Sequence, residues 1–361
     1  MNQHYVPKVY LRNFAQKKGD EYYVDVFDVS TRKTFSTNIS NICAEKDLYT
    51  LENNNSLKRD KLIVEKFYSD QIEPLYKKSY NILTNNKISY ISDELRLEIL
   101  FGIFQLYTRN PQILKLSLKV HITNIEHIYE KAIAAKEKGI TYGNIDFSFR
   151  EWSKEQIIQH IEEKLTTEFK ERHLLGTKEV IEFHQKSKLV IASIKDNANF
   201  ITSDNPLIFQ DRTTENNHPL LRSKEFTIPL NPKFALTILH DNTKNINTIY
   251  RYYIPNGSVS MINSDIEKQC SRFLIGKKDA FDIYFRMKEI LEDTSVDLQM
   301  DAMKQTLKKI PDTPENKEAI KLINIFIEKY DKQGTLSKLE QFEMHKLMRN
   351  MGIEAKKNRI K

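Results

Sequence analysis

The chain has 361 residues, of which 40% are hydrophobic and 29% are charged, a composition typical of a globular protein. No run approaches the roughly 18 apolar residues that a membrane-spanning helix needs. The N-terminus also lacks the cationic and apolar regions and the cleavage site of an export signal. We therefore expect no membrane span and a cytoplasmic location.

Charge and cysteine content narrow the class further. The formal net charge is +7 and the pI is about 9.0, a balance that favours attraction to nucleic acid or another polyanion. The two cysteines, Cys43 and Cys270, lie far apart and outside any C-x-x-C spacing. The sequence therefore supports neither a disulfide framework nor a cysteine-based zinc site.

The first half of the chain is mainly helical after one hairpin. Alternating apolar residues predict two strands within 21–39. A helical period follows over 59–83, where Pro74 is expected to kink or divide the helix. The next helix is predicted over 93–109. Because its middle, 99–107, is apolar nearly all round, we expect this helix to be central and buried.

Two longer helices are predicted next. The first covers 112–138, and Gly139 is expected to cap its C-terminus. The second begins after Ser153, which forms a capping-box pattern with Gln156.

The second half changes character near residue 188. Short apolar runs separated by Asp, Asn and Pro indicate a sheet; they are 189–192, 199–202, 226–228 and 234–238. Ser264 and Glu267 form another capping-box pattern, predicting a helix that ends at Gly276. Helical periodicity then continues past a predicted boundary near Asp293.

Together these patterns predict an α+β fold that is predominantly helical, with a buried central helix packed against a small mixed or antiparallel sheet. Residues 1–292 form the expected main domain, and 293–361 a helical, basic C-terminal extension. The basic residues of that extension are Lys338, Lys346, Arg349, Lys356, Lys357, Arg359 and Lys361. They could contact phosphates, but a solvated helical face is the better explanation, because Glu340, Glu343 and Glu354 dilute the positive charge.

Familiar catalytic motifs are missing from the sequence. It contains no G-x-x-x-x-G-K-[ST], no G-x-G-x-x-G after a strand, no H-E-x-x-H and no G-x-S-x-G. The sequence therefore lacks the residues that define P-loop, Rossmann, zincin and hydrolase-elbow proteins, and it indicates no nucleotide cofactor.

The opening segment is the densest in chemistry. His4 titrates near physiological pH and is a candidate general acid or base, while Arg12 offers a planar fork for phosphate or carboxylate. Tyr5 and Tyr10 could contact a substrate. The alternative is that the tyrosines pack in the core and His4 bonds a backbone carbonyl.

The buried helix carries two polar residues that need partners, Gln105 and Arg109. An unpaired guanidinium in a dry core is very costly, so Arg109 is expected to pair with Glu98 or Asp204. Such a pair could be an internal salt bridge that fixes packing. It could also be an anion clamp at the end of a helix.

Two loops complete the candidate site. Asp204 and Asn205 follow an apolar strand, where Asp204 could be a general base, a metal ligand or a stabiliser of positive charge; an Asx-turn before Pro206 is the alternative. The loop 45–49 adds Glu45 and Tyr49. Glu45 and Asp204 could hold a divalent metal, or Glu45 could be a solvated surface charge.

These segments, taken in order, resemble a bacterial family known as the domain of unknown function 4238 family. The resemblance is carried by His4-Tyr5-Val6-Pro7, Tyr10-Leu11-Arg12 with Phe14, Ala44-Glu45-Lys46-Asp47-Leu48-Tyr49, Arg109 with Pro111, and Ile201-Thr202-Ser203-Asp204-Asn205-Pro206. It covers roughly residues 2–280, with no counterpart beyond about 290. The resemblance implies that the scattered polar residues belong together, and it suggests a role in bacterial defence or in mobile elements.

We therefore expect a hydrolase acting on nucleic acid, DNA in the first place. In phosphodiester cleavage, His4 would move a proton, Arg12 and Arg109 would stabilise the phosphorane charge, and Asp204 would orient His4 or hold a metal. In base excision, Asp204 would stabilise a sugar cation.

The expected substrate contacts are Tyr5, Tyr10, Tyr49, Gln105 and Asn205. A non-catalytic module that binds nucleic acid or another anionic ligand is the alternative, and a scaffolding role is a third reading.

Overall fold

The computed structural model describes residues 1–52, 60–195, 198–209, 225–240, 245–293 and 313–334, together with residues 304, 307, 336 and 347. The chain divides into two compact units, Met1–Tyr284 and Phe285–Lys361. The division falls within helix α9 (Lys278–Asp293), and the domain boundary near Asp293 stays a prediction.

Helix α4 (Asp93–Thr108) runs through the core of the first unit. Its N-terminus is capped by Ser92, whose hydroxyl accepts a hydrogen bond from the Leu95 amide at 3.2 Å. Ile99 and Phe104 are fully buried, as is most of the second half of the helix. The expectation of a buried central helix is therefore confirmed, and it follows from an apolar surface that extends around the whole helix.

The chain before α4 forms two short helices and a turn. These are α2 (Ile63–Phe67), a π-helical turn η2 (Tyr68–Ile72) and α3 (Glu73–Thr84). Pro74 lies in the first turn of α3, where its missing N–H costs nothing, so it divides the segment as predicted.

Two five-stranded sheets lie in the first unit. One has the order β10 (Ile208–Phe209), β11 (Glu225–Asn231), β12 (Phe234–Leu239), β8 (Lys188–Ser193), β13 (Ile249–Tyr253), with only β8 and β13 parallel. The other contains β2 (Gln16–Lys18), β3 (Glu21–Asp28), β14 (Phe273–Gly276) and β9 (Thr202–Ser203), with β4 (Lys33–Asn38) also paired to β3. The α+β class is thus confirmed.

The N-terminal motif is held by a small sheet of its own. Strand β1 (Asn2–His4) pairs antiparallel with β5 (Ala44–Lys46), so that His4 lies opposite Ala44. Helix α1 (Lys8–Leu11) follows β1, and the 3-10 turn η1 (Ile39–Asn41) precedes β5. The sheet brings the two most characteristic loops of the sequence side by side.

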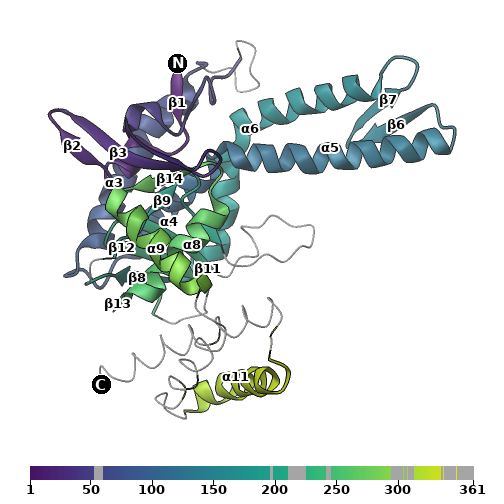
Figure 1. Cartoon of the computed structure of the whole chain (residues 1–361). Helices are drawn as coiled ribbons and strands as arrows, with labels where there is room; N and C mark the ends of the chain where they lie inside the picture. The colour runs from purple at the N-terminus through teal and green to yellow at the C-terminus, as the bar shows by residue number, and fades with distance from the viewer. Residues whose placement is uncertain are drawn as a thin grey trace. The chain divides into compact units, whose positions relative to one another are not determined.

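A helical arm projects from the first unit (Figure 1). It consists of α5 (Pro111–Ala134), the hairpin β6 (Gly139–Tyr142) and β7 (Ile145–Ser148), and α6 (Lys154–His184). The arm has its own buried cluster, composed of Ile125, Ala132, Ile140, Phe147, Ile157 and Ile161. The Ser153–Gln156 capping box at the start of α6 is confirmed.

Two predicted helix ends are wrong. Gly139 opens β6 instead of capping α5, and a Cβ there would lie 2.3 Å from the Phe147 carbonyl oxygen, so the hairpin requires glycine. Ser264 and Glu267 lie inside α8 (Asn256–Gln269), which begins after Pro255, and Gly276 ends a strand. In both cases a tertiary constraint produced a residue pattern that also marks helix ends.

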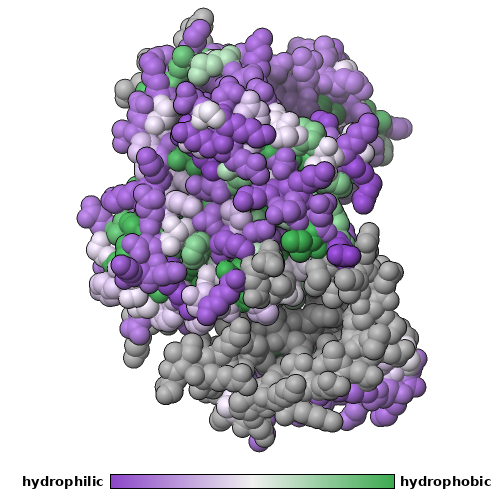
Figure 2. Space-filling view, turned by 60° about the vertical axis from the view of Figure 1, so that its left-hand side comes forward, coloured by the Kyte–Doolittle hydropathy of each residue, from purple (hydrophilic) through white to green (hydrophobic). Residues whose placement is uncertain are grey.

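The second unit contains α11 (Pro314–Gln333), which ends at Gly334 with a φ of 67°. Its apolar cluster includes Ile323, Ile327 and Tyr330. The basic residues predicted to contact phosphates lie outside the described residues. Among the helices that the structure describes, none is long and apolar enough to cross a bilayer. Figure 2 shows a face whose coloured residues are mostly hydrophilic, with hydrophobic residues in small separate groups.

Candidate functional site around Arg109

Four distant segments meet at the C-terminal end of α4. The side chain of Arg109 donates through Nη2 to the backbone oxygen of His4, and the Tyr49 hydroxyl donates to the carbonyl oxygen of Arg109. The next residue, Asn110, donates through Nδ2 to the backbone oxygen of Asp204 at 2.9 Å. The segments that the sequence grouped by chemistry therefore converge in space, and they do so mainly through backbone groups.

Arg109 is buried but only partly bonded. Its side chain is 1% exposed, and its guanidinium carbon lies 3.9 Å from the centroid of the Tyr68 ring and 5.7 Å from that of Tyr49. Nε and Nη1 have no hydrogen-bond partner among the described residues. A guanidinium has five N–H donors, so most of the donor capacity of Arg109 is unused.

The charge of Arg109 is retained despite this burial. Burial acts to lower the pKa of Arg109, but Tyr49, Tyr68 and the carboxylate of Glu73 more than offset it, and the pKa lies above its ordinary value. The guanidinium is therefore a fixed positive charge inside the protein.

Two glutamates lie within the electrostatic reach of this charge. Glu65 is in α2 and Glu73 begins α3, so η2 separates them. Burial raises the pKa of both carboxyl groups, against the opposing charges of Arg109 and Lys8. Oε2 of Glu65 is buried without a hydrogen-bond partner among the described residues, and no ion pair joins either glutamate to Arg109.

Sequence reasoning missed both glutamates. The only signal was Pro74, which indicated a division of the helix at this point. The division takes the form of a π-helical turn, a feature often found at functional sites, and it sets which side chains of α2 and α3 face Arg109.

His173 of α6 holds the Tyr68 ring, which lies against the Arg109 guanidinium. Its Nδ1 lies 2.6 Å from the Phe169 carbonyl oxygen, which can only accept, so Nδ1 carries the proton. Nε2 then accepts a hydrogen bond of 2.5 Å from the Tyr68 hydroxyl. Burial lowers the pKa of His173 to about 4, so this arrangement holds at neutral pH.

His4 contributes more through its backbone than through its ring. The ring Nε2 lies 3.3 Å from the Ile39 oxygen. Burial lowers the pKa of His4, and the charges of Lys8 and Arg109 act in the same direction. A neutral imidazole at this place can accept a proton.

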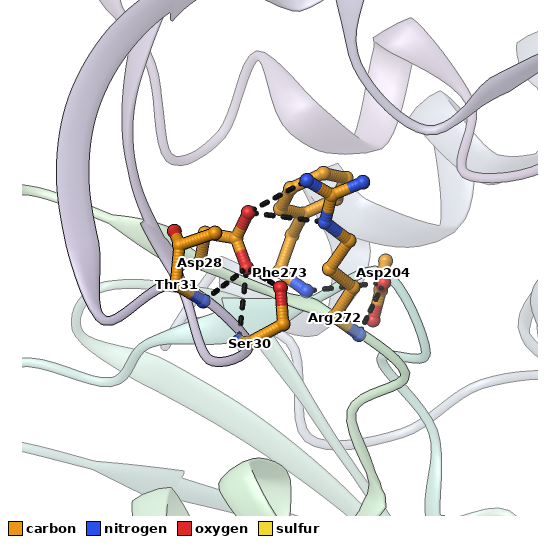
Figure 3. Close-up of polar contacts among 6 residues, drawn as sticks. All are labelled: Asp28, Ser30, Thr31, Asp204, Arg272 and Phe273. Atoms are coloured by element: carbon orange, nitrogen blue, oxygen red, sulfur yellow. Dashed lines mark hydrogen bonds and ion pairs between the residues drawn. The ribbon is translucent and has the colours of Figure 1, made fainter.

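Asp204 is bound to backbone amides and is not free to react. Its Oδ1 accepts from the Ser271 amide at 2.8 Å. Its Oδ2 accepts from the Arg272 and Phe273 amides at 2.9 and 3.1 Å (Figure 3). The residue is 2% exposed. Burial raises the pKa of its carboxyl group and the three amides oppose that shift. This bonding favours a structural role for Asp204, which fixes the loop before β14, over its expected role as a base or metal ligand.

A second carboxylate secures the same loop from its side chain. Asp28 binds Arg272 through Nε at 3.0 Å and Nη2 at 2.8 Å, and it also accepts from Ser30 and Thr31 (Figure 3). The hydrogen bond from Arg272 lowers the pKa of Asp28 most. Residues 271–273 are therefore held from two sides.

Three predicted substrate contacts are used by the fold. The Tyr10 hydroxyl is bonded to Thr202 at 2.6 Å and to the Pro229 oxygen at 2.8 Å. Gln105 donates to Thr177 at 2.7 Å, and Asn205 donates to the Gln269 oxygen at 3.0 Å. Tyr10 and Gln105 are fully buried, which corrects their expected contact with substrate.

The remaining predicted residues are more exposed than Arg109. Arg12 is exposed, with its guanidinium 5.2 Å from the Tyr22 ring centroid. Glu45 forms an ion pair of 3.6 Å with Lys115. Tyr5 is half-buried, and burial raises the pKa of its hydroxyl, assisted by Cys43 and by the charges of Asp204 and Glu45.

A metal site at Glu45 and Asp204 finds no support in the described part of the chain. No three His, Cys, Asp or Glu side chains gather there in a way that could hold an ion. The bonding of both Asp204 oxygens to amides explains why this pair offers no ligand set.

Comparison with known families covers the same segments. A model of a protein family of unknown function, DUF4238, matches residues 2–280, which include every residue of the cluster at Arg109. The chain belongs to the DUF4238 family. No curated protein and no solved structure matches the chain. In this member of the DUF4238 family, the matched region contains both the body of the first unit and the helical arm.

Proposed function

We propose that this DUF4238 protein is a hydrolase that acts on nucleic acid, DNA in the first place, in the cytoplasm and against foreign or phage sequences. The observation that carries the proposal is Arg109, a buried cation whose Nε and Nη1 find no acceptor among the described residues. Oxygen atoms of phosphate are the acceptors that a planar guanidinium binds best.

Acid and base groups lie beside this cation. Glu65 and Glu73 have raised carboxyl pKa values, which suits a general acid, and neutral His4 suits a general base. In phosphodiester cleavage, His4 would take a proton from the attacking water while a glutamic acid gives one to the leaving oxygen. Arg109 would stabilise the charge on the phosphorus oxygens. The net charge of +7 supports attraction to the substrate.

Base excision uses the same residues differently. An ionised Glu65 or Glu73 would stabilise the sugar cation that forms as the glycosidic bond breaks, and Arg109 would hold the neighbouring phosphate. The two reactions leave different products, and these separate them.

The test is incubation of the purified protein with plasmid and with modified phage DNA, each with and without EDTA. Direct strand breaks would support phosphodiester cleavage, and breaks that appear only after alkali would support base excision. Glu73→Gln should lower the rate at least about 100-fold, since general acids contribute about that much. Exposed Glu94→Gln is the matched control and should keep full activity. DNA left intact under every condition would contradict the proposal.

A non-catalytic binding module is the second candidate. It is favoured by the burial of Arg109 and by the structural use of Asp204, Tyr10 and Gln105. For an enzyme, Glu73→Gln should abolish turnover while changing DNA affinity only a few-fold. Parallel loss of affinity and of the cellular effect would favour the module.

A further inference from the structure

We propose that Arg109, Glu65 and Glu73 together bind the terminal phosphate group of a nucleotide or oligonucleotide, and that one of the two glutamates takes up a proton when the phosphate binds. This inference deepens the proposed function by naming the part of the substrate that the site recognises. It would also hold for a protein that binds nucleic acid without cleaving it.

The first step is the hydrogen-bond deficit of the cluster. Buried polar groups are nearly always bonded, and a buried cation without acceptors is especially unfavourable. Arg109 lacks partners at Nε and Nη1, and Glu65 lacks one at Oε2. Both deficits occur among groups of opposite charge that act on each other but form no ion pair. A ligand that presents oxygen acceptors to Arg109 and also accepts from a protonated glutamate would satisfy all three atoms.

The second step concerns charge. Two ionised glutamates would repel an anion, whereas a protonated glutamate donates a hydrogen bond to it. Burial already favours the protonated form of both carboxyl groups. A phosphate at Arg109 would favour it further, because negative charge beside a carboxyl group raises its pKa.

Several other charged or titratable groups surround the cluster. Lys8 acts on both glutamates, Arg12 acts on Glu73, and Glu73 acts on Glu65. Around Arg109 the titratable groups are His4, Tyr49, Tyr68 and His173. Burial keeps the two tyrosines protonated and lowers the pKa of both histidines, so the glutamates are the protein groups that a bound phosphate is expected to protonate.

The third step concerns the kind of phosphate. Arg109 is 1% exposed, while Lys8 and Glu73 are partly exposed and mark the side from which a ligand would approach. A terminal phosphate can enter with its oxygens first. An internal phosphodiester is flanked by two sugars, so it reaches a guanidinium at that depth only after a rearrangement, which cleavage of an internal bond would therefore require. The geometry therefore favours a terminal group.

The experiment measures binding without turnover. Inorganic phosphate is titrated into the full chain by calorimetry between pH 5 and pH 8, in pairs of buffers with different ionisation enthalpies. We expect uptake of up to one proton for each phosphate bound. Between the carboxyl pKa of the free protein and the higher carboxyl pKa of the complex, affinity should fall by up to about tenfold for each pH unit.

Variants assign the roles. Glu65→Gln and Glu73→Gln are tested singly and together. Loss of the responsible carboxyl group should remove the proton uptake that exceeds the ionisation of phosphate itself, and make binding at pH 8 at least about tenfold tighter than in the wild type. Arg109→Gln should abolish binding. Glu94→Gln, an exposed glutamate of the same helix, should leave affinity and its pH dependence unchanged. If Arg109→Gln fails to fold, the variants of Glu65 and Glu73 still test the inference. An unchanged pH dependence of phosphate binding in the double variant would overturn it.

Oligonucleotides then identify the source of the phosphate. A short strand with a 5′-phosphate should compete with inorganic phosphate, and the same strand without it should compete at least about tenfold less well. Equal competition would overturn the assignment to a terminal group. Phosphate binding as described, with every DNA left intact, would support this inference and contradict the proposed hydrolase. Full DNA cleavage by the Arg109→Gln variant would support a hydrolase and contradict this inference.

Discussion

Each end of helix α4 carries a buried arginine, and the two arginines differ in how many hydrogen-bond acceptors surround them. Arg96, near the N-terminal end, and Arg109, at the C-terminal end, are both 1% exposed. Arg96 donates to three backbone oxygens, those of Gln185 at 2.7 Å, Ser187 and Ile246. Arg109 has one such acceptor, at His4.

This difference separates a structural arginine from one that is available for a ligand. The three carbonyl groups around Arg96 come from two loops that the guanidinium ties to the helix. Burial lowers the pKa of Arg96 to about 10, and the group still carries its charge at neutral pH. The fold can therefore satisfy a buried guanidinium with backbone oxygens alone, and at Arg109 it does not. Four substitutions test this contrast.

Arg96→Met should have the largest effect. It removes a charged donor from three carbonyl oxygens, of which the one at Ser187 is buried, and should lower the free energy of unfolding by about 3–5 kcal/mol. Urea denaturation followed by circular dichroism measures this. A loss below about 1 kcal/mol would remove the basis of the comparison.

Asp204→Asn extends the contrast to acids. The asparagine keeps one acceptor oxygen but turns an NH₂ group toward amides that also donate, so we expect a loss of about 2–3 kcal/mol. The control is Asp265→Asn, whose carboxylate forms only an exposed ion pair with Lys268 and should change little. Equal effects of the two substitutions would argue against the structural role of Asp204.

Arg109→Met should cost less than Arg96→Met, by at least about 2 kcal/mol, when no phosphate is present. The substitution removes one hydrogen bond and relieves a buried charge that lacks acceptors. Added phosphate should raise the melting temperature of the wild type but not of this variant. Comparable losses for the two arginines would show that Arg109 is as structural as Arg96.

Glu73→Gln should have the smallest effect and the opposite sign. Because burial raises its pKa, Glu73 contributes stability that is fully present below its unfolded pKa of about 4.3 and is lost as pH rises through the folded pKa. The glutamine removes this loss. Between about pH 4.3 and neutral pH, the variant should therefore lose less stability than the wild type and be more stable at pH 7 by less than about 1 kcal/mol. Denaturation at several pH values checks the sign, and a destabilised variant would contradict it.

The sequence predicted the helix that carries Arg109 because that information is local. Apolar residues all around 99–107 indicated burial, and a buried arginine in such a helix had to be special. Its neighbours could not be found in the same way. Glu65 and Glu73 act electrostatically on Arg109 from either side of a π-helical turn, and no residue pattern predicts that turn.

Asp204 shows the same limit from the other side. Its position after an apolar strand correctly indicated an important carboxylate, but its partners are amides of 271–273, nearly 70 residues later. Amides carry no signature in a sequence, so a carboxylate that binds three of them looks like one that is free to react. Gly139 was misread for a related reason, since the nearby Phe147 oxygen that demands glycine belongs to another strand.

The helical arm constrains how members of this family can diverge. Helices α5 and α6 run to the same tip, where β6 and β7 close the arm over its own apolar cluster. A helix lengthens by about 1.5 Å per residue and returns to the same face after about seven residues. Insertions in one helix must therefore be matched in the other, in steps of about two turns. Arms of different length can arise in relatives by such paired changes while Arg109, two residues before the arm begins, keeps its surroundings.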